Sequence, residues 1–440
     1  MATRVNPQTV DPIQTTAEPV ARHAHPLSKT TKRTLNRRGV LWLGQTCNLR
    51  CYFCYFLNRI EDSSHPEHAF MSLEKAKKIC HTLRYVYGNT AIDIQGGEPT
   101  ILPDILELIR YCREIGLYPT LITNGLVLAK KEKLREFQEA GVRDFLVSLH
   151  GIGEIHDEVV CRKGSYEKII AAIENMRELG VPFRFNCTMS LPVVPILPDI
   201  AQKAIDYGAY GVNYLAFNPF EDQETGIRTH DNVSRYSDIK PQLTKAIDLL
   251  EENGIECNVR YLPLCMAEER HRKNFYNFQQ LPYDHHEWDY NSWNWTGLQP
   301  QRMKGGDMVP AFYIGPFARW IIYRYPGISR RAQRNPRLAW LGLKVQHALA
   351  RIAWSTVGKP RLYHAEGALR AAHDANYRQF DACGKCSMRN ICDGFHSDYS
   401  DLFGSDEARP ITDAPLTHDP LLYIREQEKI VEPEDRTWAL

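Results

Sequence analysis

The chain has 440 residues, and it contains no run of eighteen apolar residues and no apolar core segment among its first thirty. The first absence excludes a membrane-spanning helix, and the second excludes a secretory signal peptide. Twelve cysteines are too few for a disulfide scaffold of this length. A net charge of +1 gives no overall attraction to polyanions, and no nucleic-acid-binding module is recognisable. We therefore expect a cytoplasmic protein of two or three folded units with no nucleic-acid partner.

The cysteines are not spread evenly, and the first group is Cys47-Asn-Leu-Arg-Cys51-Tyr-Phe-Cys54, with the spacing C-x3-C-x2-C. It follows an apolar run at residues 40–43, which predicts a buried strand, so the group lies on the loop that leaves this strand. Fe–S clusters are held by cysteine thiolates, usually four. Three thiolates would leave one iron of a [4Fe–4S] cluster open to an outside ligand. The alternative is a zinc knuckle, although zinc loops favour paired C-x2-C units with a fourth ligand nearby.

With the aromatic Phe53 before its last cysteine, this motif resembles the radical S-adenosylmethionine (SAM) superfamily. A second motif, Gly96-Gly97-Glu98-Pro99 after an apolar strand, is similar to the GGEP signature of that family. The resemblance covers roughly residues 38–220. It implies that the cluster binds SAM through its open iron and receives an electron from a reductant such as flavodoxin or ferredoxin. SAM would then be cleaved to a 5′-deoxyadenosyl radical that abstracts hydrogen from the substrate.

The resemblance also implies SAM contacts on the loops after several strands. The GGEP loop would hold the amino group of SAM, although its composition also suits an ordinary turn. Residues 121–125 and 147–151 resemble the exits of the family's third and fourth strands, but His150 stands where the family often has Asp. The implied cofactor contacts are Phe53, Gly96, Gly97, Glu98, Thr123, Ser148 and Arg162.

Strand and helix patterns alternate six times from residue 39 onward. The predicted strands are 39–46, 91–95, 118–122, 143–149, 182–188 and 211–217. The predicted helices are 72–87, 102–116, 130–140, 165–179, 195–207 and 236–253, with N-caps at Ser72 and Ser165 and glycines at their ends. Such alternation predicts an α/β fold with parallel strands and crossover helices, and the resemblance implies a partial (β/α)6 TIM-like barrel. We expect a disordered tail at 1–37, the barrel at 38–230 and a smaller Fe–S-binding domain at 231–440.

A second cysteine group, Cys383, Cys386 and Cys392, has the spacing C-x2-C-x5-C. Cys265, which follows a strand-like segment, can supply a fourth thiolate, with Cys257 as its rival. These residues resemble the twitch or SPASM extension that binds auxiliary clusters in radical SAM enzymes. A full SPASM pattern would have a cysteine at His396, so we expect a single second [4Fe–4S] cluster. A structural zinc site with the same ligands is the alternative. The remaining cysteines, Cys80, Cys112, Cys161 and Cys187, are expected to be inert core residues.

An insertion at about 270–375 separates the two parts of this second group. Residues 283–295 are aromatic and polar, whereas residues 308–365 contain ten Lys or Arg and no Asp or Glu. The simplest interpretation is a packed helix pair with a solvated basic face. The functional interpretations are peripheral contact with an anionic membrane or a pocket for an anionic substrate.

The combined patterns predict a radical SAM enzyme that acts on a small-molecule or lipid- or sugar-linked biosynthetic intermediate, by epimerisation, dehydrogenation or bond formation. One alternative is a maturase that modifies ribosomal peptides. The other is a non-catalytic Fe–S electron carrier, which would explain the cysteines but not the GGEP loop or the six alternating units.

Overall fold

The computed structural model of the protein describes five long segments, residues 38–54, 56–85, 89–217, 228–277 and 377–419. It also describes short segments at 32–35, 288–289, 301–302, 308–309, 422–423 and 428–431, and a few positions between 324 and 356. Most of the predicted basic stretch 308–365, almost all of the aromatic segment 283–295 and most of the predicted tail lie outside these residues.

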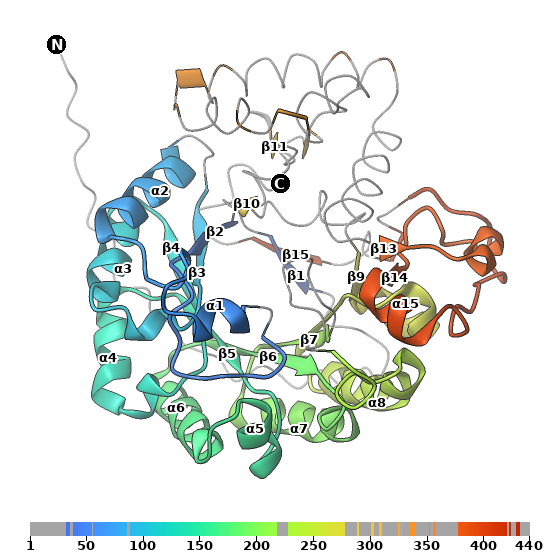
Figure 1. Cartoon of the computed structure of the whole chain (residues 1–440), viewed down its shortest axis with the longest axis horizontal. Coiled ribbons are helices and arrows are strands. Elements are labelled where there is room, and N and C mark those ends of the chain that lie inside the picture. Colours follow the sequence, from blue (N-terminus) through green and yellow to red (C-terminus); the bar gives the residue numbers. More distant parts are fainter. Residues whose placement is uncertain are drawn as a thin grey trace.

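A single parallel sheet organises the fold, in the order β10-β2-β3-β4-β5-β6-β7-β8-β9. Its strands are β2 (Arg38–Trp42), β3 (Ala91–Gln95), β4 (Tyr118–Thr123), β5 (Asp144–Ser148), β6 (Phe183–Met189), β7 (Gly211–Ala216), β8 (Glu256–Arg260), β9 (Phe275–Tyr276) and β10 (Trp288–Asp289). Neighbouring parallel strands in chain order need a crossover between them. Figure 1 shows these crossovers as an arc of helices outside a curved sheet. The predicted partial barrel and its six strands are therefore confirmed.

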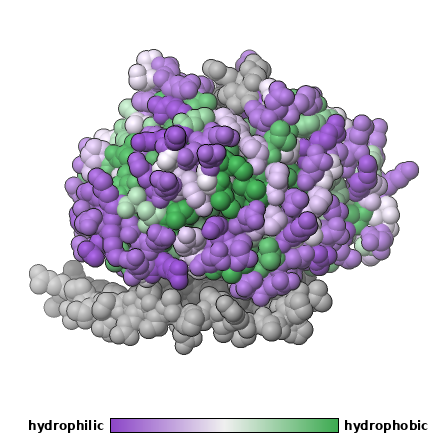
Figure 2. Space-filling model, turned by 90° about the horizontal axis from the view of Figure 1, so that it is seen from below, coloured by the Kyte–Doolittle hydropathy of each residue, from purple (hydrophilic) through white to green (hydrophobic). Residues whose placement is uncertain are grey.

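The six predicted helices are also present, within a few residues of their expected ends. They are α2 (Leu73–Tyr85), α3 (Ile105–Glu114), α4 (Lys131–Ala140), α6 (Ser165–Leu179), α7 (Leu197–Tyr207) and α8 (Tyr236–Glu252). Each buries an apolar stripe against the sheet; in α3 the buried positions are Ile105, Leu108, Ile109 and Cys112, the spacing of one helix face. Figure 2 shows the side on which α5 (Glu154–Val159), α6 and α7 lie, where apolar residues occur in small areas among polar ones.

The helix ends follow the predicted signals with one exception. The Ser72 hydroxyl accepts a hydrogen bond from the Lys75 N–H at 3.3 Å, as an N-cap does. Ser165, however, is the first residue of α6, and its buried hydroxyl has no hydrogen-bond partner among the residues that the structure describes. Gly164 occupies the N-cap position, and the carboxylate of Asp157 accepts the first-turn N–H of Tyr166 at 2.8 Å. The predicted N-cap at Ser165 is wrong, because the Asp157 carboxylate of the preceding helix α5 caps the first turn of α6 instead.

Two predicted boundaries change at the edges of the fold. Residues 32–35, assigned to the tail, form β1 (Lys32–Leu35), which pairs in parallel with β15 (Glu428–Val431). A four-residue strand has too few positions to show alternation, and its partner lies at the other end of the chain. Likewise β8 and β9 extend the barrel sheet past the predicted end at residue 230, with η5 (Glu269–Asn274) on the segment that connects them.

The C-terminal domain packs against the barrel helix α8. It contains η7 (Asp381–Lys385), the pair β13 (Tyr377–Arg378) and β14 (Phe395–His396), and α15 (Ser397–Phe403), which lies beside α8 in Figure 1. The Tyr236 and Tyr399 rings stack 3.6 Å apart, and the Tyr399 hydroxyl accepts the Tyr236 N–H at 2.8 Å. Within the part of the chain that the structure describes, no helix combines the length and apolarity needed to span a bilayer.

Candidate functional site: two groups of cysteines

The first cysteine group lies on the loop that leaves β2, at the carboxyl edge of the sheet. The loop is anchored at the end of α5, where Arg50 N–H donates to the Val160 carbonyl at 3.4 Å and Tyr52 N–H donates to the Val159 carbonyl at 3.3 Å. Leu49, Val160 and Leu126 form a small apolar cluster against which Cys47 and Cys51 pack. The loop is therefore fixed by residues from two neighbouring strand exits.

Burial keeps the thiols of this loop protonated until a metal binds. Burial and the nearby charge of Glu98 raise the pKa of Cys47 to about 12, and burial raises that of Cys54 to about 11. Without a metal these thiols keep their protons, and metal binding must displace them. The Cys47 sulfur accepts the Leu49 N–H at 3.4 Å, a kind of contact that tunes Fe–S clusters. An all-sulfur donor set on one loop fits the three-thiolate side of a [4Fe–4S] cluster.

The two glycines of the GGEP loop are required by close packing of backbone on backbone. A Cβ on Gly97 would lie 2.1 Å from the Thr46 carbonyl oxygen, and a Cβ on Gly96 would lie 2.3 Å from the Gly44 oxygen. The Gly97 N–H donates to Gly44 at 2.8 Å, and the Glu98 N–H donates to Thr46 at 2.9 Å. Glycine has no Cβ and lets another group approach closely. The structure shows that the approaching group is the segment immediately before Cys47, so this loop positions the first cysteine.

Glu98 joins the exits of β3 and β4. Its carboxylate is 1% exposed. Oε1 accepts bonds from the Thr100 N–H at 3.1 Å, the Thr100 hydroxyl at 2.6 Å and the Thr123 hydroxyl at 2.7 Å, and Oε2 accepts the Asn124 N–H at 2.7 Å. Burial raises the pKa of Glu98, although these bonds favour its charged form. Two predicted cofactor contacts, Glu98 and Thr123, are thus joined by a hydrogen bond.

The other predicted cofactor contacts surround the same loop. The Phe53 ring lies 4.4 Å from the ring of His150, and Arg162 donates to the Asn48 carbonyl at 2.8 Å. Ser148 ends β5 and is half-buried. His150 Nδ1 accepts the Thr188 N–H at 3.0 Å, and burial lowers its pKa well below the usual range, so the ring is neutral.

Sequence reasoning missed a pair of asparagines beside these contacts. Asn124 donates through Nδ2 to Asn48 Oδ1 at 2.7 Å, which links the β4 exit to the cysteine loop. Asn48 lies in the first cysteine motif and Asn124 lies in the segment 121–125. Nothing else in the sequence indicated this hydrogen bond.

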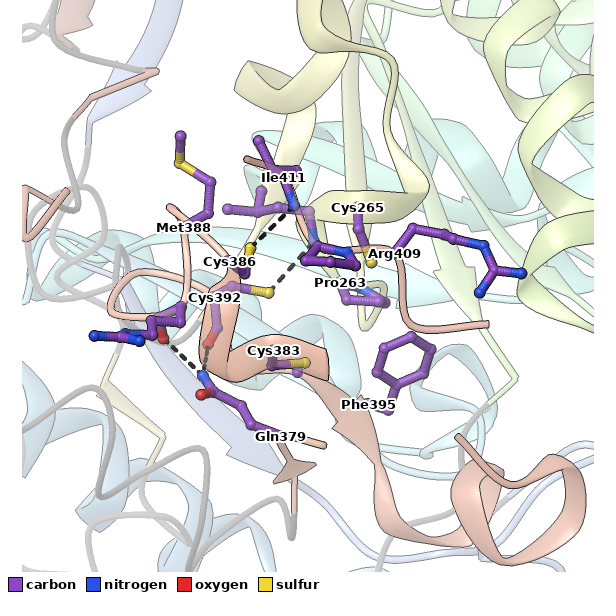
Figure 3. Close-up of a pocket in the computed structure, with 14 residues that line it drawn as sticks. Pro263, Cys265, Gln379, Cys383, Cys386, Met388, Cys392, Phe395, Arg409 and Ile411 are labelled. Carbon is purple, nitrogen blue, oxygen red and sulfur yellow. Dashed lines mark hydrogen bonds between the residues drawn. The ribbon is translucent and has the colours of Figure 1, made fainter. Parts of the chain in front are cut away.

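All four predicted ligands of the second group line one pocket of about 360 Å³, part of which is open to solvent. Figure 3 shows Cys265, from η4 (Leu264–Met266), facing Cys383, Cys386 and Cys392 of the C-terminal domain. Cys392 accepts the Leu264 N–H and Cys386 accepts the Ile411 N–H, each at 3.4 Å from the sulfur. Sulfurs with backbone donors again match an Fe–S site.

The rival ligand Cys257 is fully buried in β8 and does not line this pocket. Among the described residues, no group of three or more His, Cys, Asp or Glu side chains is arranged to hold a single metal ion. Of the cysteines expected to be inert, Cys80, Cys112 and Cys187 are buried, whereas Cys161 is exposed. The prediction of a core position for Cys161 is wrong, because it follows the short helix α5 in a left-handed turn with φ of 54°.

Part of the chain, including the first cysteine group, matches a known family. The model of the radical SAM superfamily matches residues 43–207. An AdoMet-dependent heme synthase of Oleidesulfovibrio alaskensis is 32% identical over 200 residues, which cover 44% of this chain and 50% of the relative. A PqqA peptide cyclase of Bradyrhizobium diazoefficiens is 31% identical over 172 residues, covering 39% and 43%. A GTP 3′,8-cyclase of Peptoclostridium acidaminophilum is 34% identical over 146 residues, covering 32% and 43%.

Among solved structures, Streptococcus suis SuiB matches with a TM-score of 0.43 and 17% identity, over 51% of this chain and 50% of that chain. The chain spans about half the length of the curated relatives it matches.

Proposed function

The chain belongs to the radical SAM superfamily through residues 43–207, and on this premise we propose that it is an enzyme that cleaves SAM reductively. Cys47, Cys51 and Cys54 would hold the [4Fe–4S] cluster. When bound, such a cluster supplies the electron that cleaves the sulfonium of SAM to a 5′-deoxyadenosyl radical, which takes hydrogen from the substrate. The observation that carries the proposal is the fixed loop of three thiols at the carboxyl edge of a parallel sheet, where barrel enzymes place their chemistry.

The surrounding residues have distinct roles in this proposal. The apolar cluster at Leu49 keeps water from the sulfurs, and the GGEP loop holds the backbone before Cys47 in place. The charge of Glu98 favours a cationic amino group next to its loop, and Arg162 offers a guanidinium to the carboxylate of SAM. Ser148 would contact the ribose or the same carboxylate.

We propose that the second pocket binds an auxiliary [4Fe–4S] cluster through Cys265, Cys383, Cys386 and Cys392. Support comes from the convergence of all four thiols on one pocket and from the backbone N–H donors to two of the sulfurs. The cluster would bind substrate or exchange an electron with it. An external reductant such as flavodoxin or ferredoxin would supply the electron to the cluster at the first site.

The substrate would be a biosynthetic intermediate held between the barrel and the C-terminal domain. Peptide modification is the second candidate, because one relative is a peptide cyclase by name. A non-catalytic electron carrier would share the clusters but would not bind SAM.

The test is turnover of SAM by anaerobically reconstituted protein with dithionite. We expect 5′-deoxyadenosine from the wild type and none from Cys51→Ala, because two thiolates cannot hold the cluster. Cys187→Ala is the matched control, since this buried cysteine lies on β6 in the core. Full turnover by Cys51→Ala would reject the assignment, and equilibrium SAM binding separates an enzyme from an electron carrier.

A further inference from the structure

Two arginine side chains bind the backbone of the first cysteine loop from its outer side. One nitrogen of the Arg50 guanidinium donates to the carbonyl of Cys47 at 2.9 Å and to that of Leu49 at 2.8 Å. The Arg162 guanidinium, from the turn that follows α5, donates to the carbonyl of Asn48 at 2.8 Å. Both arginines are exposed. Three consecutive carbonyls of the loop therefore accept hydrogen bonds from cations at the surface of the protein.

The hydrogen bond from Arg162 leads directly to a proposed cluster ligand. The Asn48 carbonyl and the Leu49 N–H belong to the same peptide group, and this N–H donates to the Cys47 sulfur at 3.4 Å. A cation at the carbonyl polarises the peptide group and strengthens the hydrogen bond that its N–H makes. Part of the positive charge of Arg162 is thus passed to Cys47 Sγ through two hydrogen bonds in series.

The charge of Arg50 acts on the same sulfur through space. Burial and the charge of Glu98 raise the pKa of the Cys47 thiol, and the charge of Arg50 opposes them, so the guanidinium charge reaches this sulfur. The form of cysteine that binds a metal is the thiolate, so this attraction persists when a cluster is bound. Reduction by one electron makes a cluster more negative, and its net charge and the hydrogen bonds to its sulfurs set its reduction potential.

We propose that Arg50 and Arg162 are positioning residues that raise the reduction potential of the first cluster. The inference rests on the proposed function and concerns its first step, in which the cluster takes one electron from the external reductant. Both cations lie on the cysteine loop, and both favour the state with the additional negative charge, Arg50 by Coulomb attraction and Arg162 by strengthening the hydrogen bond to Cys47. Without them the cluster would be harder to reduce.

The test is a redox titration of the reconstituted full chain without SAM, with dithionite as the reductant and the reduced cluster followed by EPR. Subtracting the signal of the triple variant Cys47/Cys51/Cys54→Ala isolates the first cluster. We expect Arg50→Met to make its reduction about threefold to tenfold less favourable, where tenfold corresponds to 59 mV for a one-electron couple. Arg50→Lys keeps the charge and should keep most of the potential. Arg50→Gln keeps a hydrogen-bond donor without the charge and should resemble Arg50→Met.

Arg162→Met should shift the potential in the same direction, because it loses the bond to the Asn48 carbonyl. The omission of SAM keeps the proposed contact between Arg162 and the SAM carboxylate out of this measurement. Arg135→Gln, which removes an exposed arginine from α4, is the matched control and should leave the potential unchanged. Iron analysis and circular dichroism establish that each variant holds the first cluster and is folded. If Arg50→Met loses iron, the comparison of Arg50→Lys with Arg50→Gln decides.

Three outcomes would overturn the inference. The potential of Arg50→Gln could equal that of the wild type, or Arg50→Lys could lose as much potential as Arg50→Gln, and either result would show that the charge has no effect. Loss of the first cluster from all three Arg50 variants would make this arginine a structural part of the loop alone. Formation of 5′-deoxyadenosine by the wild type is measured separately. Its absence would reject the proposed function, while the potentials would still decide whether the arginines act on the cluster.

Discussion

The two groups of cysteines differ in how the chain brings them together. Cys47, Cys51 and Cys54 share one loop, and its shape is fixed by backbone contacts with the next strand exit. The second pocket combines Cys265 after β8 with three cysteines that follow more than a hundred residues later. The first group therefore depends on local packing at a sheet edge. The second depends on docking of the C-terminal domain on α8, so changes in one region should leave the other intact.

The largest effect is expected when the first group is removed. The triple variant Cys47/Cys51/Cys54→Ala should form no 5′-deoxyadenosine, and its iron content should fall from about eight to about four per chain, given four-iron clusters held by thiolates. Iron analysis and anaerobic turnover measure these outcomes. One equivalent of zinc in place of the remaining iron would show that the second pocket is a zinc site.

The second group gives the converse experiment, with a control three residues from the end of β8. Cys265→Ala leaves the second cluster one thiolate short of the usual four and should lower the iron content by up to about four per chain, while the first cluster stays because its three cysteines lie on a separate loop. Cys257→Ala removes a buried sulfur from the core strand and should keep all iron, at a cost of about 1 kcal/mol in unfolding free energy. Equal iron loss in both variants would contradict the choice of Cys265.

The features that could be predicted from the sequence are those that depend on local contacts, as the first cysteine group does. The six strands and six helices were found within a few residues because hydrophobic periodicity and terminal glycines are local signals. The first cysteine loop was predictable from spacing, and the second group from spacing together with a family resemblance.

Pairings between distant segments were not predictable. Neither the β1–β15 pair nor the edge strands β9 and β10 show a period, because each is two to four residues long. The close packing of Gly96 and Gly97 was not predictable either, since only the fold shows which backbone lies against them. The contact of Arg162 with the Asn48 carbonyl likewise follows from tertiary structure alone.

Two glycines allow the comparison to be made at the level of single Cβ atoms. Gly97→Ala would place a methyl group against the Thr46 carbonyl, whereas Gly384→Ala, between two cysteines of the second group, meets no atom of the described residues within 4 Å. We expect Gly97→Ala to cost about 1–3 kcal/mol, as overpacking does, and to lower the iron content of the first site. Gly384→Ala should change stability by less than about 0.5 kcal/mol. Urea unfolding and iron analysis of both variants measure the contrast; equal losses would mean that the two loops are held alike.

The smallest expected effect is a difference in how stability depends on pH. The contributions of Glu251, on α8, and Glu98, beside the first group, should have opposite signs. Glu251, on α8, accepts a hydrogen bond from Asn274 at 2.7 Å and lies near Lys273 and His271 of η5. Burial opposes its ionisation, but the hydrogen bonds and charges of η5 outweigh burial, so the pKa of Glu251 lies below its ordinary value of 4.5. Its contribution to stability is therefore complete above pH 4.5 and is lost as the pH falls below that value.

The contribution of Glu98, beside the first group, to stability depends on pH with the opposite sign. Burial raises its pKa above the same ordinary value of 4.5, so its contribution is complete below pH 4.5 and is lost as the pH rises through the raised pKa. In urea unfolding of the iron-free protein between pH 3.5 and 6.5, Glu251→Gln should flatten the fall in stability toward acid. Glu98→Gln should make the curve climb more steeply with pH, because it removes the group that opposes the climb. The same change of slope in both variants would show that folding does not shift the pKa values of Glu98 and Glu251 in opposite directions.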